Sequence, residues 1–295
     1  MLQKLVRVFV GPCVLLAAIS AVPYARAQQS GGEHKPPRIL TVVREFLKPG
    51  KDGTAHEKTE ALFIDAFRRA NVSSHYLGMV SLTGRPRALF FEGYDSIEQW
   101  RKGQKEFEKA GSAFDRANEA DGALLESTDR TVWYFEEEGS FNTSVDLAHV
   151  RYFEIERFTL RQGHEADFME GAKLVKAAYA KSFPDAHWAM YSAIYGMAQP
   201  TYVILTPLKS AAEIDHFFAN YSKFAEAMGP DGMKRLTELS ASGIESSETN
   251  LFAIEPKMSY MGDEIVNADP EFWRPQAAAA KKAPAKAAEK PKANP

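Results

Sequence analysis

The feature that most constrains this fold is a short stretch of sequence that occurs twice. Residues 150–163 read Val-Arg-Tyr-Phe-Glu-Ile-Glu-Arg-Phe-Thr-Leu-Arg-Gln-Gly, and a weaker copy occupies residues 38–50. Each copy alternates between apolar and polar residues, ends in a Leu-basic-X-Gly turn and is followed by a helical pattern. Because self-similarity at a fixed spacing is typical of one structural unit used twice, we expect two equivalent modules.

The elements around the two copies follow the same order, as the switches between strand and helix periodicity indicate. In the first module, residues 38–145, the predicted strands and helices are 38–47, 54–70, 75–82, 87–94, 97–110, a short helix to about 125, and 131–136. In the second module, residues 146–260, they are 150–160, 165–181, 187–194, 201–206, 210–228, 232–239 and 250–255. This order is that of a ferredoxin-like β-α-β-β-α-β unit.

The second copy resembles the first-strand motif of the NIPSNAP family, which runs aromatic-Glu-Leu-Arg-x-Tyr-x-Leu-x-Pro-Gly. The resemblance rests on residues 153–163, and Leu47-Lys48-Pro49-Gly50 is similar to the end of the motif. Two such units in one chain resemble the dimeric α+β barrel superfamily, which includes antibiotic-biosynthesis-type monooxygenases and haem-handling enzymes. The resemblance covers residues 38–260 and implies that the two units form one barrel.

The geometry of such a unit leads to the same architecture. Both helices cover one face of a four-stranded antiparallel sheet, and the other face is bare. Two bare faces bury each other when the sheets pack together. We therefore predict an α+β chain in which two tandem ferredoxin-like βαββαβ modules pack sheet to sheet as an intrachain pseudo-dimeric barrel. The lumen between the sheets is then the expected place for a ligand.

The alternation within the first strands assigns side chains to the two faces of each sheet. We place the uninterrupted apolar alternates on the helix side: Leu40, Val42, Phe153 and Ile155. The lumen side of the second module then carries Tyr152, Glu154, Glu156 and Phe158. The predicted ligand-binding residues are Tyr152, Phe158, Trp188, Met190, His75, Tyr76 and Met79. A lumen with these side chains suits a small apolar or aromatic molecule.

The polar candidates allow two interpretations, which stay open. In the first, His187 acts with Glu154 or Glu156 as a catalytic acid and base, because imidazole titrates near neutral pH. In the second, His75 and His187 begin strands and hydrogen-bond to the backbone, and the two glutamates are solvated or ion-paired.

No cofactor or metal motif stands out. The pairs His56-Glu57 and His164-Glu165 lack the second histidine of the zinc-protease helix, and neither a phosphate loop nor a dinucleotide fingerprint occurs. His216 invites comparison with the haem ligand of related barrels, but the apolar stripe of its helix places it toward solvent. We therefore predict no cofactor and no metal.

Residues 1–27 have the organisation of an export signal. Lys4 and Arg7 precede an apolar run at residues 8–22, and a small-residue site ends at Ala27. The run is shorter than the roughly 20 apolar residues of a membrane span. We therefore predict cleavage after Ala27, no transmembrane segment, and a periplasmic or secreted protein. Cys13, the single cysteine, leaves with the signal, so the mature chain has no disulfide bond.

The distribution of charge along the chain indicates which kinds of partner the protein can bind. Loss of the signal takes the net charge from −3 to −6, and the Lys/Ala/Pro tail at residues 277–295 carries +4, which leaves −10 for residues 28–276. A body of this sign is a poor nucleic-acid binder, because phosphate neutralisation requires clustered Lys and Arg. The tail is predicted to be disordered, and it either contacts an anionic envelope surface or solubilises the protein. Residues 28–37 form a flexible lead-in and residues 261–276 an extension, and we expect a monomer or weak homo-oligomer.

Three functions are compatible with these features. The first is a binding protein whose lumen takes a small apolar or aromatic molecule. The second is a cofactor-independent monooxygenase or isomerase of the kind that the superfamily contains, and the third is a non-catalytic envelope scaffold. An open apolar lumen favours binding, a lumen in which His187 and a glutamate converge favours catalysis, and a lumen filled by side chains favours the scaffold.

Overall fold

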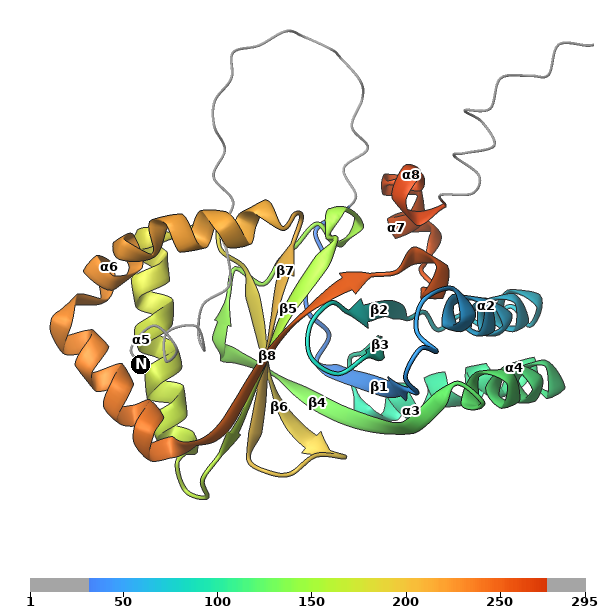
Figure 1. The fold of residues 1–295 in the computed structure, drawn as a ribbon, viewed down its shortest axis with the longest axis horizontal. Helices are drawn as coiled ribbons and strands as arrows, with labels where there is room; N and C mark the ends of the chain where they lie inside the picture. Colours follow the sequence, from blue (N-terminus) through green and yellow to red (C-terminus); the bar gives the residue numbers. More distant parts are fainter. Residues whose placement is uncertain (1–31, 275–295) are drawn as a thin grey trace, which may run out of the picture.

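The computed structural model describes residues 32–274. The predicted export signal and the predicted disordered tail lie outside the described residues, as do residues 28–31 of the lead-in and 275–276 of the extension. Within the described range, eight strands close into one antiparallel barrel, with helices on two sides of it (Figure 1). The predicted α+β class and the closed barrel are therefore confirmed.

The strands and helices occur in the predicted order. The first half comprises β1 (Ile39–Leu47), α2 (Thr54–Arg69), β2 (Leu77–Ser81), β3 (Arg87–Tyr94), α3 (Ile97–Phe107), η2 (Glu108–Ala110), α4 (Ser112–Gly122) and β4 (Leu125–Phe141). The second half comprises η3 (Leu147–His149), β5 (Tyr152–Leu160), α5 (Glu165–Ser182), β6 (Trp188–Tyr195), β7 (Thr201–Leu208), α6 (Ala212–Gly243) and β8 (Ile244–Ile254). The chain continues through η4 (Pro256–Met258), α7 (Asp263–Ala268) and α8 (Pro270–Trp273). None of the helices in residues 32–274 has the length and apolar character of a membrane span.

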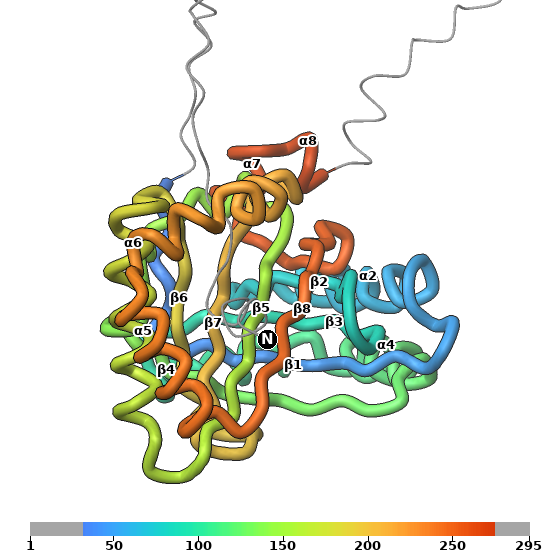
Figure 2. The backbone as a smooth tube through the Cα atoms, turned by 60° about the vertical axis from the view of Figure 1, so that its left-hand side comes forward, coloured from blue at the N-terminus to red at the C-terminus, as the bar shows by residue number. Residues whose placement is uncertain are grey.

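Two strands are longer than the sequence indicated, and they close the barrel. β4 pairs with β1 along its first part and with β6 of the other half along its second part. β8 pairs in the same way with β5 and with β2. The order around the barrel is β1-β3-β2-β8-β5-β7-β6-β4, and Figure 2 shows the strands of both halves around one interior. Because the circuit closes, the strands of the described chain present no free sheet edge.

The face assignment made from the sequence was wrong for both first strands. The residues assigned to the helix side join an apolar core inside the barrel: Leu40, Val42, Phe153 and Ile155. The residues assigned to the lumen side alternate with these, so they lie on the outer face: Tyr152, Glu154, Glu156 and Phe158. Eight strands exclude water from the lumen on all sides, whereas one layer of helices covers the outer face less completely. The most apolar alternates therefore point inward.

The helices lie on opposite sides of the barrel, with α5 and α6 against the second half and α2, α3 and α4 against the first (Figure 1). Under α5 and α6 a large apolar core includes Phe158, Tyr179 and Phe224. Under the helices of the first half a smaller apolar core surrounds Phe67 and Tyr76. The space beside this smaller core contains the candidate site.

Candidate functional site

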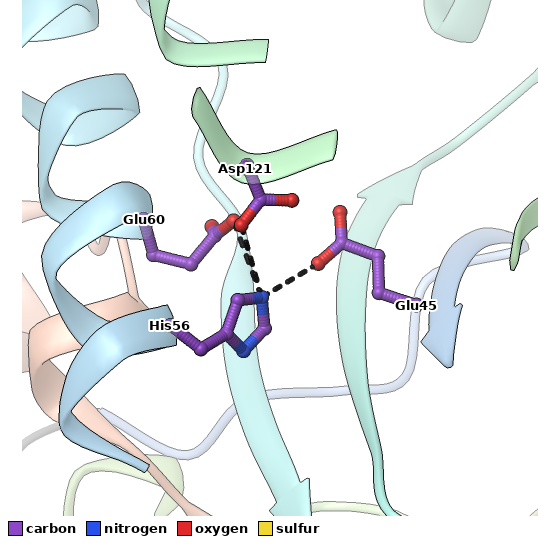
Figure 3. Close-up of side chains that lie close together, drawn as sticks. All are labelled: Glu45, His56, Glu60 and Asp121. Carbon is purple, nitrogen blue, oxygen red and sulfur yellow. Dashed lines mark hydrogen bonds and ion pairs between the residues drawn. The ribbon is translucent and has the colours of Figure 1, made fainter. Parts of the chain in front are cut away.

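Four polar side chains converge between the sheet and the helices of the first half (Figure 3). Glu45 comes from β1, His56 and Glu60 lie one turn apart on α2, and Asp121 lies in the last turn of α4. The i,i+4 spacing puts His56 and Glu60 on the same face of α2. We refer to these four residues as the His56 cluster.

The imidazole of His56 lies at the centre of the cluster. Its Nε2 atom is 3.0 Å from Oε2 of Glu45, 3.3 Å from Oδ1 of Asp121 and 3.7 Å from Oε1 of Glu60. Thr59 Oγ1 donates a hydrogen bond of 2.7 Å to Oδ1 of Asp121, which helps to orient that carboxylate. One donor atom from each cluster residue lies within 4.8 Å of those from the other three.

The cluster is almost completely removed from solvent. The side chains of His56, Glu60 and Asp121 are 1%, 4% and 3% exposed. Within the described part of the chain, Nδ1 of His56 and Oε1 of Glu60 have no hydrogen-bond partner. Such buried atoms are uncommon, because each costs about 1–3 kcal/mol. Oε1 of Glu60 therefore remains able to bind a further group beside the imidazole.

The cluster binds protons more tightly than its residues do in water. Burial raises the pKa of Glu60 well above its usual value, and the charges of Glu45 and Asp121 raise it further. Burial also raises the pKa of Glu45, although its hydrogen bond with His56 opposes this effect. Burial alone would lower the pKa of His56, but hydrogen bonds to Asp121 and Glu45 and the charge of Glu60 raise it to about 10. At neutral pH the imidazole of the metal-free cluster therefore carries a proton.

A divalent metal ion fits this set of donors. Imidazole and carboxylate together suit Mn²⁺, Fe²⁺ and Zn²⁺. The ion would supply the positive charge that three buried carboxylates require, and it would replace the bound protons. The alternative is a metal-free network of ion pairs that ties α2 and α4 to β1. The two alternatives differ in whether a metal ion displaces the protons.

The His56 cluster forms part of the wall of a large cavity between the sheet and α2, α3 and α4. This helix-side cavity has a volume of about 760 Å³, and the carboxylates of Glu45, Glu60 and Asp121 line it. Much of the remaining wall is aromatic: Phe63, Phe67, Tyr76, Phe90, Phe107 and Phe114. Small-molecule sites generally have volumes of about 300–1,000 Å³. The helix-side cavity therefore has the size and the lining of a binding site.

The cavity wall has a second polar anchor in Glu92 of β3. Its Oε2 atom accepts hydrogen bonds from Thr41 at 3.3 Å, Tyr94 at 2.9 Å and Gln104 at 2.9 Å. Gln104 also accepts a hydrogen bond from Arg130. Three donors hold the carboxylate of Glu92 in one orientation, so it presents a fixed polar group to the cavity.

The predicted catalytic residues do not meet in the lumen. Glu154 and Glu156 lie on the outer face of β5, where Glu156 is buried against α5. Burial raises the pKa of Glu154 to about 7. His187 precedes β6, and its Nδ1 donates a hydrogen bond of 2.5 Å to the carbonyl oxygen of Asn142. The placement of Glu154 and Glu156 in the lumen was wrong, and the catalytic role of these two residues and of His187 stays a prediction.

Three predicted ligand-binding residues line a pocket at one end of the barrel. His75, Tyr76 and Trp188 border this pocket, which has a volume of about 230 Å³ and a largely apolar wall. The other predicted residues lie outside it: Tyr152, Phe158, Met190 and Met79. The lumen is therefore a packed apolar core with pockets at its ends, and the ligand-binding role of these residues stays a prediction.

The sequence interpretation missed all members of the His56 cluster. His56 and Glu60 carry a local signal, because an i,i+4 pair of ligand-type residues shares one helix face. The zinc-protease motif requires a second histidine, so comparison with that motif does not detect a His-Glu pair. Glu45 and Asp121 carry no local signal, since only the packing of β1, α2 and α4 brings them to the imidazole.

The chain matches no protein-family model, and no curated protein matches it significantly. Among solved structures, a Fusobacterium nucleatum protein provisionally named a monooxygenase has a TM-score of 0.48 and 11% identity, over 73% of this chain and 91% of that chain. An anthrone oxidase-like protein has a TM-score of 0.47 and 12% identity, over 74% and 92%. A mutant chlorite dismutase from Candidatus Nitrospira defluvii has a TM-score of 0.47 and 9% identity, over 78% and 94%. Similarity at this level carries no information on activity.

Proposed function

We propose that this protein is a metal-dependent enzyme that acts on a small organic molecule in the helix-side cavity. The observation that carries the proposal is that three carboxylates of the His56 cluster open onto a cavity of about 760 Å³. A metal ion at the cluster would border a molecule in the cavity. A purely structural ion-pair network needs no adjoining cavity, so the combination favours a functional centre.

The surrounding residues suggest how a substrate is held. The His56 cluster would hold the ion, which when bound acts as a Lewis acid toward an oxygen of the substrate. The aromatic wall around Phe67 and Phe107 suits an apolar or aromatic body. Glu92 is fixed by three donors and is placed to orient a polar substituent. We therefore propose an aromatic or apolar substrate that carries oxygen substituents.

Metal titration tests the proposed centre. After chelator treatment, Mn²⁺ and Zn²⁺ are titrated by calorimetry at pH 8 into the wild-type chain and into His56→Ala. We expect a single ion to bind the wild type, and about 100-fold weaker binding to the variant. His164→Ala is the matched control, because His164 pairs with Asp167 at 2.7 Å at the start of α5 in the other half. Equal metal affinity in wild type and His56→Ala would exclude the metal role.

Native mass spectrometry of protein purified from its source tests the proposed cavity. We expect a retained small molecule that is lost when Asn118→Trp fills the cavity, because Asn118 lines it. Glu119→Trp is the control, since this neighbouring side chain does not line the cavity. Retention of the molecule by Asn118→Trp would contradict a helix-side site.

The lumen remains a second candidate for ligand binding. The pocket of about 230 Å³ beside His75, Tyr76 and Trp188 supports the binding of a small apolar molecule at one end of the barrel. A molecule that survives Asn118→Trp but is lost from Ala189→Trp would lie there, because Ala189 lines this pocket. Turnover that survives chelation would favour the cofactor-independent monooxygenase or isomerase that the sequence resemblance implies.

We also propose that the two halves are tandem ferredoxin-like modules of the NIPSNAP type. Two observations support this. Both halves pair their strands in the same order. Gly50 and Gly163 end the two copies of the motif with φ angles of 73° and 85°, a conformation that favours glycine.

Export is a proposal that rests on the sequence alone. We propose a periplasmic or secreted protein whose signal is removed after Ala27 and whose Lys-rich tail contacts an anionic envelope surface. The mass of the protein from its source tests cleavage, and co-sedimentation with phosphatidylglycerol vesicles, with and without residues 277–295, tests the tail. A full-length mass would contradict cleavage after Ala27. Equal sedimentation of both forms would contradict membrane contact through the tail. A scaffold function would be favoured if the vesicles bind and no ligand is found.

A further inference from the structure

The lumen has a second pocket at its other end, and the chemistry of this pocket differs from that of the first. It has a volume of about 210 Å³ and an apolar floor that includes Trp133, Leu89 and Phe252. Three arginines line it as well: Arg44, Arg87 and Arg157. We refer to it as the arginine pocket. The body of this chain carries a negative charge, so a concentration of arginine inside the barrel is unexpected.

Strand periodicity explains how the arginines reach the lumen. Arg44, Arg87 and Arg157 stand two residues from the inward-facing Val42, Leu89 and Ile155 on β1, β3 and β5. Residues two apart on a strand share a face, so the three guanidinium groups point into the same end of the barrel. They meet there because these strands belong to one closed circuit.

The acidic groups nearby do not balance all three arginines. Asp129 pairs with Arg44 through two hydrogen bonds, of 2.6 Å and 2.8 Å. Glu248 of β8 is shared, since it accepts from Nη2 of Arg87 at 3.1 Å and from Nη2 of Arg157 at 2.8 Å. One carboxylate therefore serves two guanidinium groups, which leaves one positive charge in excess. Each guanidinium has five N–H donors, and the bonds to Asp129 and Glu248 use only one or two of them.

We propose that the arginine pocket is a binding site for a small organic anion, with its carboxylate on the N–H groups of Arg87 and Arg157 that do not bond to Glu248 and its apolar body on the floor. The guanidinium fork matches a planar carboxylate. Arg87 also lies over the ring of Phe252, at 5.2 Å from the centroid, which restricts its guanidinium. An apolar cavity of about 150 Å³ holds benzene, so a pocket of about 210 Å³ accepts one ring with a carboxylate.

This site is separate from the helix-side cavity. Arg44 and Glu45 are consecutive residues on β1, yet Arg44 lines the arginine pocket and Glu45 belongs to the His56 cluster on the opposite face. The proposal does not depend on the metal centre. A variant of the His56 cluster can therefore serve as a control for binding in the lumen.

Binding of benzoate, compared with its neutral isostere benzamide, tests the proposal. Calorimetry measures the affinities, and the fluorescence of Trp133 on the pocket floor reports the location. We expect benzoate to bind about tenfold more tightly than benzamide, because a carboxylate makes charge-assisted hydrogen bonds to the guanidinium groups and the neutral amide does not. Affinity for benzoate should fall with increasing salt, whereas affinity for benzamide should not.

Variants locate the site. Arg157→Gln is preferred, because its side chain is 39% exposed and its loss disturbs the fold least. Arg157→Gln should remove the preference for benzoate over benzamide. Two control variants should retain this preference: Arg235→Gln on the outside of α6, and Glu60→Gln in the His56 cluster. Equal affinities for benzoate and benzamide in the wild type, absence of binding, or unchanged benzoate affinity in Arg157→Gln would each overturn the proposal. Loss of benzoate binding in Glu60→Gln would also overturn it, since that result would place the anion in the helix-side cavity.

Discussion

The two halves of the barrel pair their strands alike, but their helix layers differ. In the second half an apolar core fills the space under α5 and α6, and the pockets found there have volumes of only about 10 Å³. In the first half the helices enclose a cavity of about 760 Å³. Glu45 and Phe158 occupy equivalent positions in the two copies of the motif. Phe158 is fully buried with its ring 5.3 Å from that of Phe168, whereas Glu45 belongs to the His56 cluster.

The two helix layers differ in what they bury. The apolar layer of the second half removes aromatic surface from water, which stabilises the barrel. The first half instead buries a histidine and three carboxylates, an arrangement that costs free energy. The same strand arrangement thus supports one helix layer that is filled by side chains and one that leaves a cavity.

The largest expected effect is a loss of stability when the His56 cluster is disrupted. His56→Ala leaves three buried carboxylates without their cation, and we expect it to lower the free energy of unfolding by about 3–5 kcal/mol in metal-free protein at pH 8. Urea unfolding measures the change. His164→Ala in the other half should cost less than about 1 kcal/mol, because its pair with Asp167 is exposed. Similar losses in both variants would remove the distinction between the halves.

Matched truncations test whether one layer is filled and the other open. Phe224→Ala creates a hole in the filled layer, where Phe224 is fully buried, and should cost about 3–5 kcal/mol. Phe114→Ala only enlarges the existing cavity, which Phe114 lines, and should cost about 1–2 kcal/mol. Chemical denaturation of both variants provides the comparison. If Phe114→Ala were the more damaging change, the cavity would be absent in solution.

The pH dependence of stability sharpens the same contrast. In metal-free protein the pKa of His56 is raised from 6.5 to about 10, and burial raises the pKa values of Glu45 and Glu60 above 4.5. The folded state then binds protons more tightly than the unfolded state, so stability falls as pH rises. The glutamate contribution is lost above pH 4.5, and that of His56 is fully present below pH 6.5 and lost as pH approaches 10.

Calorimetric scans after chelation should therefore show a melting temperature that decreases between pH 5 and pH 10. Glu60→Gln should flatten this decrease, because it removes one of the titrating carboxyl groups from the cluster. Saturating Mn²⁺ or Zn²⁺ should restore stability at high pH, since the ion replaces the protons. A melting temperature that rises with pH in metal-free protein would contradict the buried cluster.

The smallest expected effect concerns an acid in the filled half. Burial raises the pKa of Glu154 to about 7, so its ionised form destabilises the folded state above that pH. Glu154→Gln should raise the free energy of unfolding by about 2–3 kcal/mol at pH 8 and by less than about 1 kcal/mol at pH 5. The difference between the two pH values is the measurement. An equal gain at both would show that ionisation of Glu154 is not involved.

Short-range patterns predicted much of the fold. The hairpin strand predicted at residues 87–94 is observed as Arg87–Tyr94, because its alternation and its flanking turns are local signals. β4 and β8 were predicted too short. The missed residues 125–130 pair with β1 and the missed residues 244–249 pair with β5, while Phe141 pairs with Trp188 of the other half. No local pattern marks a residue whose partner is about a hundred positions away. For the same reason the sequence missed Glu45 and Asp121, which join His56 only through packing.

The sequence by itself determined the order of the elements, the alternation along each strand and the α+β class. Periodicity states which residues share a face, since neighbouring side chains on a strand must point to opposite sides. It does not state which face is enclosed. Only the closed barrel decided that, because eight strands shield their interior more completely than helices shield the outer face. Closure therefore placed the apolar core and the arginine pocket inside, and the His56 cluster with its cavity under the helices.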